Sequence, residues 1–198
     1  ETVYIATDGN GVHFLSHKKQ QVTRRFYHDV SDKEGIRSNS VYSLLVDDRG
    51  AVWVGHFQAG LDYSLYQNGL FRTYAYPPLF NSANLSIRSF ISRGQEKVIG
   101  SRDGLFYINE ATGMVKSFVK PVLTSDLILT ISFYQGEYYI GTYGGGMMVL
   151  NPETLSLKYF SQSDTELFQK GHIFCVKPDT KGNLWIGTSQ GLFNYNGQ

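Results

Sequence analysis

Five histidines are the residues of this sequence most able to do acid–base or metal chemistry: His13, His17, His28, His56 and His172. None lies in an HExxH motif or forms an i, i+4 pair on a helix, the spacings that hold zinc. Cys175 is the single cysteine, and no CxxC or Cys/His spacing surrounds it. We therefore predict neither a metal nor a cofactor, and only a site assembled across separate segments stays open.

Other motifs of a chemical kind indicate turns. Asp47-Asp48-Arg49-Gly50 lacks the acidic spacing of a calcium loop and is interpreted as a hairpin turn. Tyr143-Gly144-Gly145-Gly146 opens no helix, so a turn with positive φ explains it better than a phosphate cradle. GxSxG and kinase motifs are missing from the sequence. Asp103 with Asp126 is the one pair that we can offer for glycoside chemistry, which needs two carboxylates about 5–10 Å apart.

The composition favours β structure and disfavours binding to polyanions. The 198 residues include 18 Lys and Arg against 17 Asp and Glu, and the net charge of +1 argues against a nucleic-acid module. Aromatic residues make up 15%, charged residues only 18%, and there are 21 glycines. The longest apolar stretch, near residues 127–134, is far shorter than a membrane span. Because no signal peptide opens the sequence, we expect that it begins after processing or inside a longer chain.

One pattern recurs five times along the chain: an aromatic or aliphatic residue, a β-branched residue, a small residue, a short turn, then Gly and an apolar residue. Its copies begin at Tyr4, Trp53, Val98, Tyr139 and Trp185, which lie 49, 45, 41 and 46 residues apart. An apolar run that ends in a polar turn precedes each of the last four copies, and an alternating segment with charges follows most of them. Each unit thus holds four short strands, which we call a, b, c and d.

A period of 40–50 residues with four strands in each unit is typical of β-propeller blades. We predict an all-β propeller of about five blades in one segment, residues 1–198. The predicted parts are a partial blade (1–28), three blades (about 39–76, 85–119 and 126–160) and a partial blade (171–198). The two partial blades both contain strands b and c and cannot merge, so the ring is expected to be incomplete. An incomplete ring exposes apolar blade faces and should self-associate or pair with further chain.

Two of the copies also resemble the repeat of two-component regulator propellers. Residues 39–56 resemble that repeat, as do residues 173–188, in which Asp179, Gly182-Asn183 and Trp185-Ile186-Gly187-Thr188 match the core of the family motif. The middle copies match less well, because Val98 and Tyr139 replace Trp and because Lys97 and Tyr138 replace the usual Leu.

The resemblance implies a function, although the shared motif is structural and carries no site residue. It implies a non-catalytic sensor segment of a hybrid two-component histidine kinase, on the periplasmic side of the inner membrane in a membrane-anchored parent. The implied ligands are oligosaccharides released from glycans. The implied partners are the remainder of the sensor propeller, the kinase and a second receptor copy, and no nucleic acid is expected to bind.

Loops b–c and d–a emerge on the same face of a propeller, and the d–a loops are the long ones here: residues 28–40, 77–85, 120–126 and 161–171. Planar polar groups beside aromatic rings suit sugars. The ligand-binding candidates on these loops are Arg37, Asn39, His56, Gln58, Arg102, Asp103, Tyr143, His172 and Gln190. Two alternatives remain open: a carbohydrate-active propeller enzyme (polysaccharide lyase or glycosidase) and a pure protein-interaction scaffold.

Overall fold

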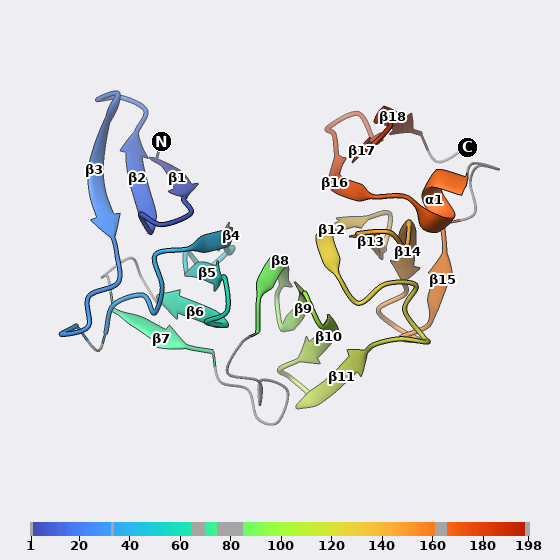
Figure 1. Cartoon of the computed structure of the whole chain (residues 1–198), viewed down its shortest axis with the longest axis horizontal. Helices are drawn as coiled ribbons and strands as arrows, with labels where there is room; N and C mark the ends of the chain where they lie inside the picture. Colours follow the sequence, from blue (N-terminus) through green and yellow to red (C-terminus); the bar gives the residue numbers. More distant parts are fainter. Residues whose placement is uncertain (1, 33, 65–69, 75–84, 161–165, 197–198) are drawn as a thin grey trace. The chain divides into compact units, whose positions relative to one another are not determined.

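The computed structural model of the chain describes residues 2–32, 34–64, 70–74, 85–160 and 166–196. These residues form five small antiparallel sheets that follow one another along the chain, as Figure 1 shows. The fold is therefore an all-β propeller of five blades, as predicted from the repeat. Within the described ranges, no helix is long and apolar enough to cross a membrane.

The blades contain three or four strands each, in the order in which the sequence presents them. The first blade contains β1 (Thr2–Ala6), β2 (Val12–Ser16) and β3 (Gln21–Phe26). The second contains β4 (Val41–Val46), β5 (Val52–His56), β6 (Leu61–Ser64) and β7 (Phe71–Thr73). The third contains β8 (Ile87–Arg93), β9 (Glu96–Ser101), β10 (Gly104–Asn109) and β11 (Met114–Phe118). The fourth contains β12 (Ile128–Tyr134), β13 (Glu137–Thr142), β14 (Met147–Leu150) and β15 (Leu157–Tyr159). The fifth contains β16 (Ile173–Pro178), β17 (Leu184–Thr188) and β18 (Gly191–Tyr195).

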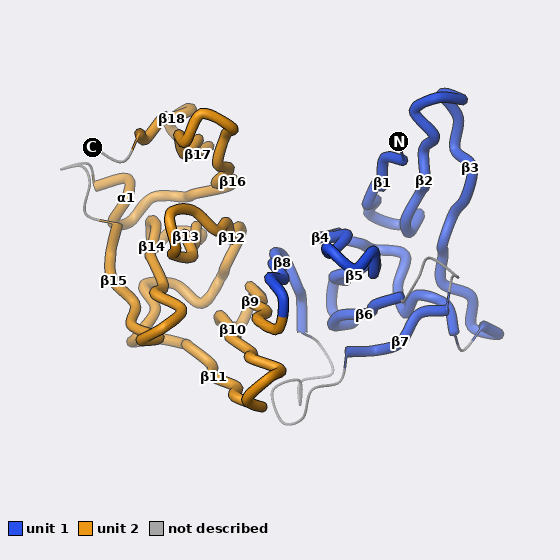
Figure 2. Tube along the Cα trace, turned by 180° about the vertical axis from the view of Figure 1, so that it is seen from behind, with its two compact units in different colours: residues 1–94 blue, residues 95–198 orange. Residues whose placement is uncertain are grey.

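The chain divides into two compact units, residues 1–94 and 95–198, which Figure 2 draws in different colours. In the first unit, Val52 and Val54 of β5 share a buried cluster with Phe14 of the first blade. In the second unit, Tyr139 and Val149 of the fourth blade share a cluster with Ile186 of the fifth. Alternate residues of the central strands thus face the preceding blade, and each apolar core lies between blades rather than within one sheet.

The small residue of the repeat lies where the next blade presses against strand b. A Cβ atom added at Gly55 would lie 2.9 Å from Ile87, and one at Gly100 would lie 2.5 Å from Ile128. The branched first residue of the next strand a therefore leaves no room for a side chain at this position.

The a–b turn has the same construction in the second and fifth blades. The carboxylate of Asp47 accepts hydrogen bonds from the backbone N–H groups of Arg49 and Ala51 and from the indole Nε1 of Trp53 (3.0, 2.9 and 3.0 Å). Asp179 accepts in the same way from the backbone N–H groups of Lys181 and Asn183 and from Trp185 Nε1. The acidic, turn and tryptophan positions of the motif therefore form one structural unit, and Asp47-Asp48-Arg49-Gly50 is a turn as predicted.

Where the third and fourth blades depart from the motif, the polar replacements have partners. Lys97 is fully buried, and its Nζ forms an ion pair with Glu110 at 2.5 Å. The hydroxyl of Tyr138 donates to Glu96 at 3.0 Å, and the hydroxyl of Tyr107 donates to the same carboxylate at 2.6 Å. Burial of the Tyr107 hydroxyl and its hydrogen bond to Glu96 raise the pKa of Tyr107 to about 12. These acceptors satisfy groups that would otherwise be costly to bury.

The last d–a loop contains one short helix, α1 (Glu166–Lys170). Leu167 and Phe168 of this helix are buried. Most of the expected d–a loop at 77–85 lies outside the described residues, as do residues 161–165 of the last such loop.

Candidate functional site

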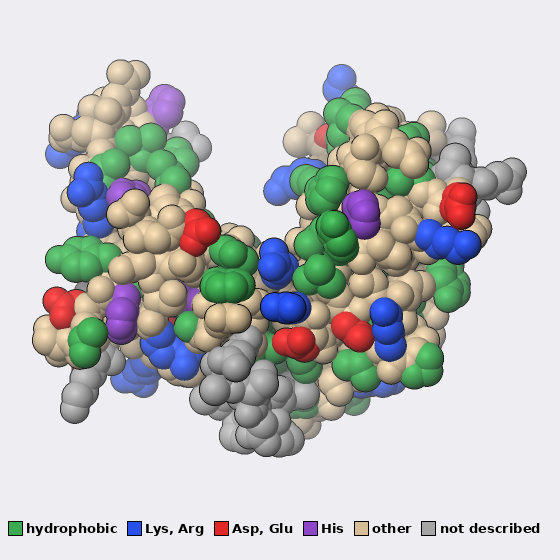
Figure 3. Space-filling model, in the orientation of Figure 1, with side chains coloured by type: hydrophobic (Ala, Val, Ile, Leu, Met, Phe, Trp, Pro, Cys, Tyr) green, Lys and Arg blue, Asp and Glu red, His purple; other side chains and the backbone are tan. Residues whose placement is uncertain are grey.

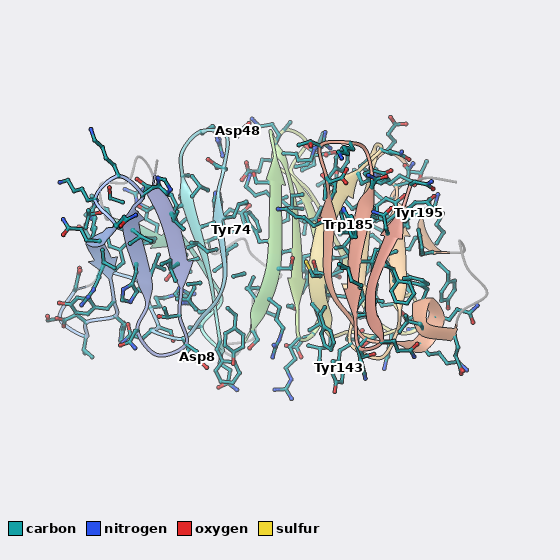
Figure 4. All side chains as sticks on the ribbon, turned by 90° about the horizontal axis from the view of Figure 1, so that it is seen from above. Asp8, Asp48, Tyr74, Tyr143, Trp185 and Tyr195 are labelled. Atoms are coloured by element: carbon teal, nitrogen blue, oxygen red, sulfur yellow. The ribbon has the colours of Figure 1, made fainter. Side chains whose placement is uncertain are left out.

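Hydrogen bonds place the b–c and d–a loops on a common face in each unit. The backbone N–H of Gly11, in the first b–c turn, donates to the carbonyl of Asn39 at 2.9 Å. Gly60 donates in the same way to Leu85, and Gly146 donates to Gly171, both at 3.0 Å. Figure 4 shows the two ends of the strands in unit 1: Asp8 marks a b–c turn at one end, and Asp48 marks an a–b turn at the other.

Two of the candidate residues, Arg37 and His56, meet through a third residue, Asp62. His56 is completely buried, and its Nε2 lies 2.9 Å from Asp62 Oδ2. Because an ionised carboxylate only accepts hydrogen bonds, Nε2 is the protonated nitrogen. Arg37 donates its backbone N–H and its Nε to the same carboxylate, both at 2.9 Å, and donates its guanidinium to the carbonyl of Ala59. We call these three residues the His56 cluster.

The His56 cluster replaces a simpler contact that is found in the other blades. There the equivalent hydroxyl donates to the carbonyl of the glycine that opens strand c, at Thr7, Ser101, Thr142 and Thr188. The position of Asp62 on strand c carries Phe106, Met148 or Phe193 in the later blades. In the second blade, His56 and Asp62 thus replace a hydroxyl residue and an apolar residue together, and they bond to each other. Because His56 is buried, a ligand has no direct access to the imidazole.

Two other candidates, Tyr143 and His172, lie in contact in the second unit. Their rings stack with centroids 3.9 Å apart and an interplanar angle of 26°. His172 also stacks on Phe174 of β16, at 6.2 Å and 29°. Figure 4 shows Tyr143 at one end of the strands, with its side chain directed away from them.

The remaining candidates are spread over separate turns. Asn39 accepts from the backbone N–H of His28 with its side chain and from Gly9 and Gly11 with its carbonyl, so it orders the loop. Gln58 and Gln190 are exposed, and Gln58 has a positive φ of 54°. Arg102 and Asp103 form the exposed turn between β9 and β10.

The two carboxylates offered for glycoside chemistry, Asp103 and Asp126, lie in a b–c turn and a d–a loop of the second unit. Asp126 Oδ1 accepts the backbone N–H of Lys120 at 2.7 Å and closes the loop between them, while Asp103 is exposed in its turn. Among the described residues, no group of three His, Cys, Asp or Glu side chains could hold a metal ion.

Sequence reasoning missed Asp62 and Phe174. The sequence did contain a signal for Asp62, because the later blades carry an apolar residue at the same position of strand c. Phe174 follows His172 at the same-face spacing of a strand.

Comparison with known proteins supports the interpretation of the repeats. A family model described as "Two component regulator propeller" matches residues 35–58 and 168–190. The chain therefore contains two-component regulator propeller repeats. The search of curated proteins found no significant match.

Solved structures extend the similarity along the whole chain. The extracellular domain of a protein assigned to the hybrid two-component systems of B. thetaiotaomicron is 25% identical, with a TM-score of 0.76 over 100% of this chain and 27% of that one. A second extracellular domain from the same organism, at 23% identity, gives a TM-score of 0.74 over 98% of this chain and 25% of that one. The WD40 propeller of Doa1 shares the fold at 13% identity, with a TM-score of 0.68 over 98% of this chain and 59% of that one.

The chain spans about a quarter of the length of the two bacterial domains. The regulator propeller repeats and the 25% identity to the extracellular domain of a hybrid two-component system support a non-catalytic sensor propeller segment.

Proposed function

We propose that this chain is a segment of the periplasmic sensor region of a hybrid two-component histidine kinase anchored in the inner membrane. In this role it binds glycan-derived oligosaccharides on the face of the b–c and d–a loops. Binding would be transmitted to the kinase as a rigid-body change of packed blades. The segment itself carries no catalytic role.

One observation carries the proposal: two regulator-propeller repeats lie in a chain that is 25% identical over its full length to an extracellular domain of a hybrid two-component system. The arrangement of the loop face agrees with it, because exposed rings and amide side chains stand on turns held by backbone hydrogen bonds. Such turns present binding groups with little loss of conformational entropy on binding.

We also propose that further propeller repeats are partners of this segment. Trp185 and Leu192 of the fifth blade are 40% and 67% exposed, whereas their counterparts Trp53 and Leu61 in the second blade are 3% and 1% exposed. A Cβ at Gly187 would meet only Cys175, at 3.5 Å, where the equivalent glycines meet a branched residue of the next blade. A blade whose strand a begins with a branched residue would cover this face. In the parent receptor, the kinase and a second receptor copy complete the set of partners.

Isothermal titration of the chain with a panel of xylo-, arabino-, malto- and galacturono-oligosaccharides tests the sensing role. We expect saturable binding of one sugar class and recovery of that sugar intact by chromatography. A cleaved sugar, with cleavage lost in Asp103→Asn, would instead establish the propeller enzyme. If neither the chain nor the complete sensor region binds any of the sugars, the remaining alternative is a pure protein-interaction scaffold.

A further inference from the structure

Tyr143, His172 and Phe174 form a continuous stack of three rings, which we call the aromatic stack. Successive centroids lie 3.9 and 6.2 Å apart, and the interplanar angles of 26° and 29° keep the rings close to parallel. The two outer rings, Tyr143 and Phe174, are 50% and 51% exposed. Figure 3 shows hydrophobic side chains gathered at the surface over β12 and β16.

Backbone hydrogen bonds fix the loop that carries Tyr143. Its N–H donates to the carbonyl of Leu127 at 2.9 Å, and its carbonyl accepts from the hydroxyl of Ser125 at 2.8 Å. Three residues later, Gly146 donates to Gly171, directly before His172. The stack therefore joins two blades of one unit and is held in place before any ligand arrives.

One glycine of this turn, Gly144, lies at the edge of the stack. Gly144 has a φ of +78°, and a Cβ there would lie 3.7 Å from His172 Cε1 and 4.0 Å from Nδ1. His172 Nδ1 is buried and has no hydrogen-bond partner among the described residues. A side chain at position 144 would pack directly against this edge of the imidazole, and the glycine omits that contact.

The backbone links two polar residues to the stack. Ser189 donates its backbone N–H to the carbonyl of His172 at 3.2 Å, and both Ser189 and the adjacent Gln190 are exposed. A hydroxyl and an amide beside a flat apolar surface match a sugar, whose C–H face packs on rings and whose hydroxyls need hydrogen-bond partners. An apolar protein partner would leave these polar groups unmatched.

We propose that the aromatic stack is a sugar-binding platform, on which Tyr143 and Phe174 each pack against a pyranose or furanose ring and Ser189 and Gln190 bind hydroxyls. Because Tyr143, Phe174, Ser189 and Gln190, which contact the sugar, carry no charged group, the platform selects neutral sugars. This inference rests on the proposed function and names the residues and the ligand class of its site.

Titration calorimetry and saturation-transfer NMR of the 198-residue chain test the platform with neutral xylo-, arabino- and malto-oligosaccharides. We expect Tyr143→Ala and Phe174→Ala to weaken the binding about tenfold or more each, because each removes a stacked ring. Tyr143→Phe keeps the ring and should bind like the unmodified chain. Tyr159→Ala is the matched control, since Tyr159 is also more than half exposed but lies on the outer strand β15.

Circular dichroism confirms that each variant is folded before it is titrated. Binding that survives both alanine variants, or that Tyr159→Ala weakens equally, overturns the platform and leaves the proposed sensing role standing. Binding of galacturono-oligosaccharides alone overturns the neutral-sugar assignment. If no sugar of any class binds the unmodified chain, the platform is overturned, and the proposed sensing role is overturned only when the complete sensor region also binds no sugar.

Discussion

The carboxylate of Asp47 has a structural role at the a–b turn. Burial raises the pKa of this group, but the hydrogen bond from Trp53, the backbone N–H groups of Ala51 and Arg49 and the charge of Arg49 together hold it below the usual 3.8. In Asp179 the hydrogen bonds from Asn183 are the largest cause of a pKa far below that value. The acidic and tryptophan positions of the repeat are therefore linked through a hydrogen bond to the ionised carboxylate.

The lowered pKa of Asp47 predicts a loss of stability in acid. A carboxyl group with a folded pKa below its unfolded value stabilises the protein above about pH 4, and this stabilisation is lost as the pH falls through the folded pKa. We expect Asp47→Asn to reduce the free energy of unfolding by about 1–3 kcal/mol at neutral pH. Urea unfolding at several pH values should show a weaker acid dependence for the variant.

Asp48→Asn is the control for this experiment, since the adjacent Asp48 is exposed. An acid dependence that Asp47→Asn leaves unchanged while Asp48→Asn reduces it would contradict the assignment.

The His56 cluster predicts non-additive mutations. Asp62→Ala removes the acceptor of a buried imidazole and of Arg37, so we expect a loss of about 3–5 kcal/mol. His56→Thr with Asp62→Phe introduces the pair that the fifth blade carries at these positions, Thr188 and Phe193, and the double variant should lose less stability than the sum of its single variants. Denaturant unfolding of the four proteins measures this coupling, and strict additivity would argue against the cluster.

At the level of strands, the repeated glycine provides a matched pair of mutations. A Cβ at Gly141 would lie 2.7 Å from Ile173 and 2.6 Å from Thr130, whereas one at Gly187 would meet only Cys175 at 3.5 Å. We expect Gly141→Ala to cost about 1–3 kcal/mol by overpacking. Gly187→Ala should be neutral or slightly stabilising, because alanine restricts the unfolded chain. Equal losses in thermal or urea unfolding would contradict the proposed packing role.

The strands could be predicted from the sequence because the residue pattern of each strand agrees with its place in the repeat. Apolar runs, turn residues and the glycine position recur together, so the three- and four-stranded blades could be assigned from spacing alone. The His56 cluster could not be predicted in full, since Arg37 and Asp62 are 25 residues apart and meet only when the d–a loop folds back. Tyr143 and His172 were named as separate loop residues, because their contact depends on the packing of neighbouring blades.

For the molecule as a whole, the exposed blade faces predict association. Val3 and Ile5 of the first blade are 43% and 37% exposed, whereas their counterparts Val52 and Val54 are fully buried. With Trp185 and Leu192 exposed on the fifth blade, we expect the isolated chain to self-associate as its concentration rises. Sedimentation velocity should show this, and Leu192→Lys should weaken it. A monomer at all concentrations would contradict the expectation.

The most direct test of the sensor account is an amide NMR titration of the isotopically labelled chain with the oligosaccharide that binds best. The account predicts that the largest shifts fall at residues 142–146, 171–174 and 188–190, while the spectrum of the sugar itself stays unchanged with time. Shifts centred on the opposite turns, at residues 47–51 and 179–183, or the appearance of new sugar products would contradict it.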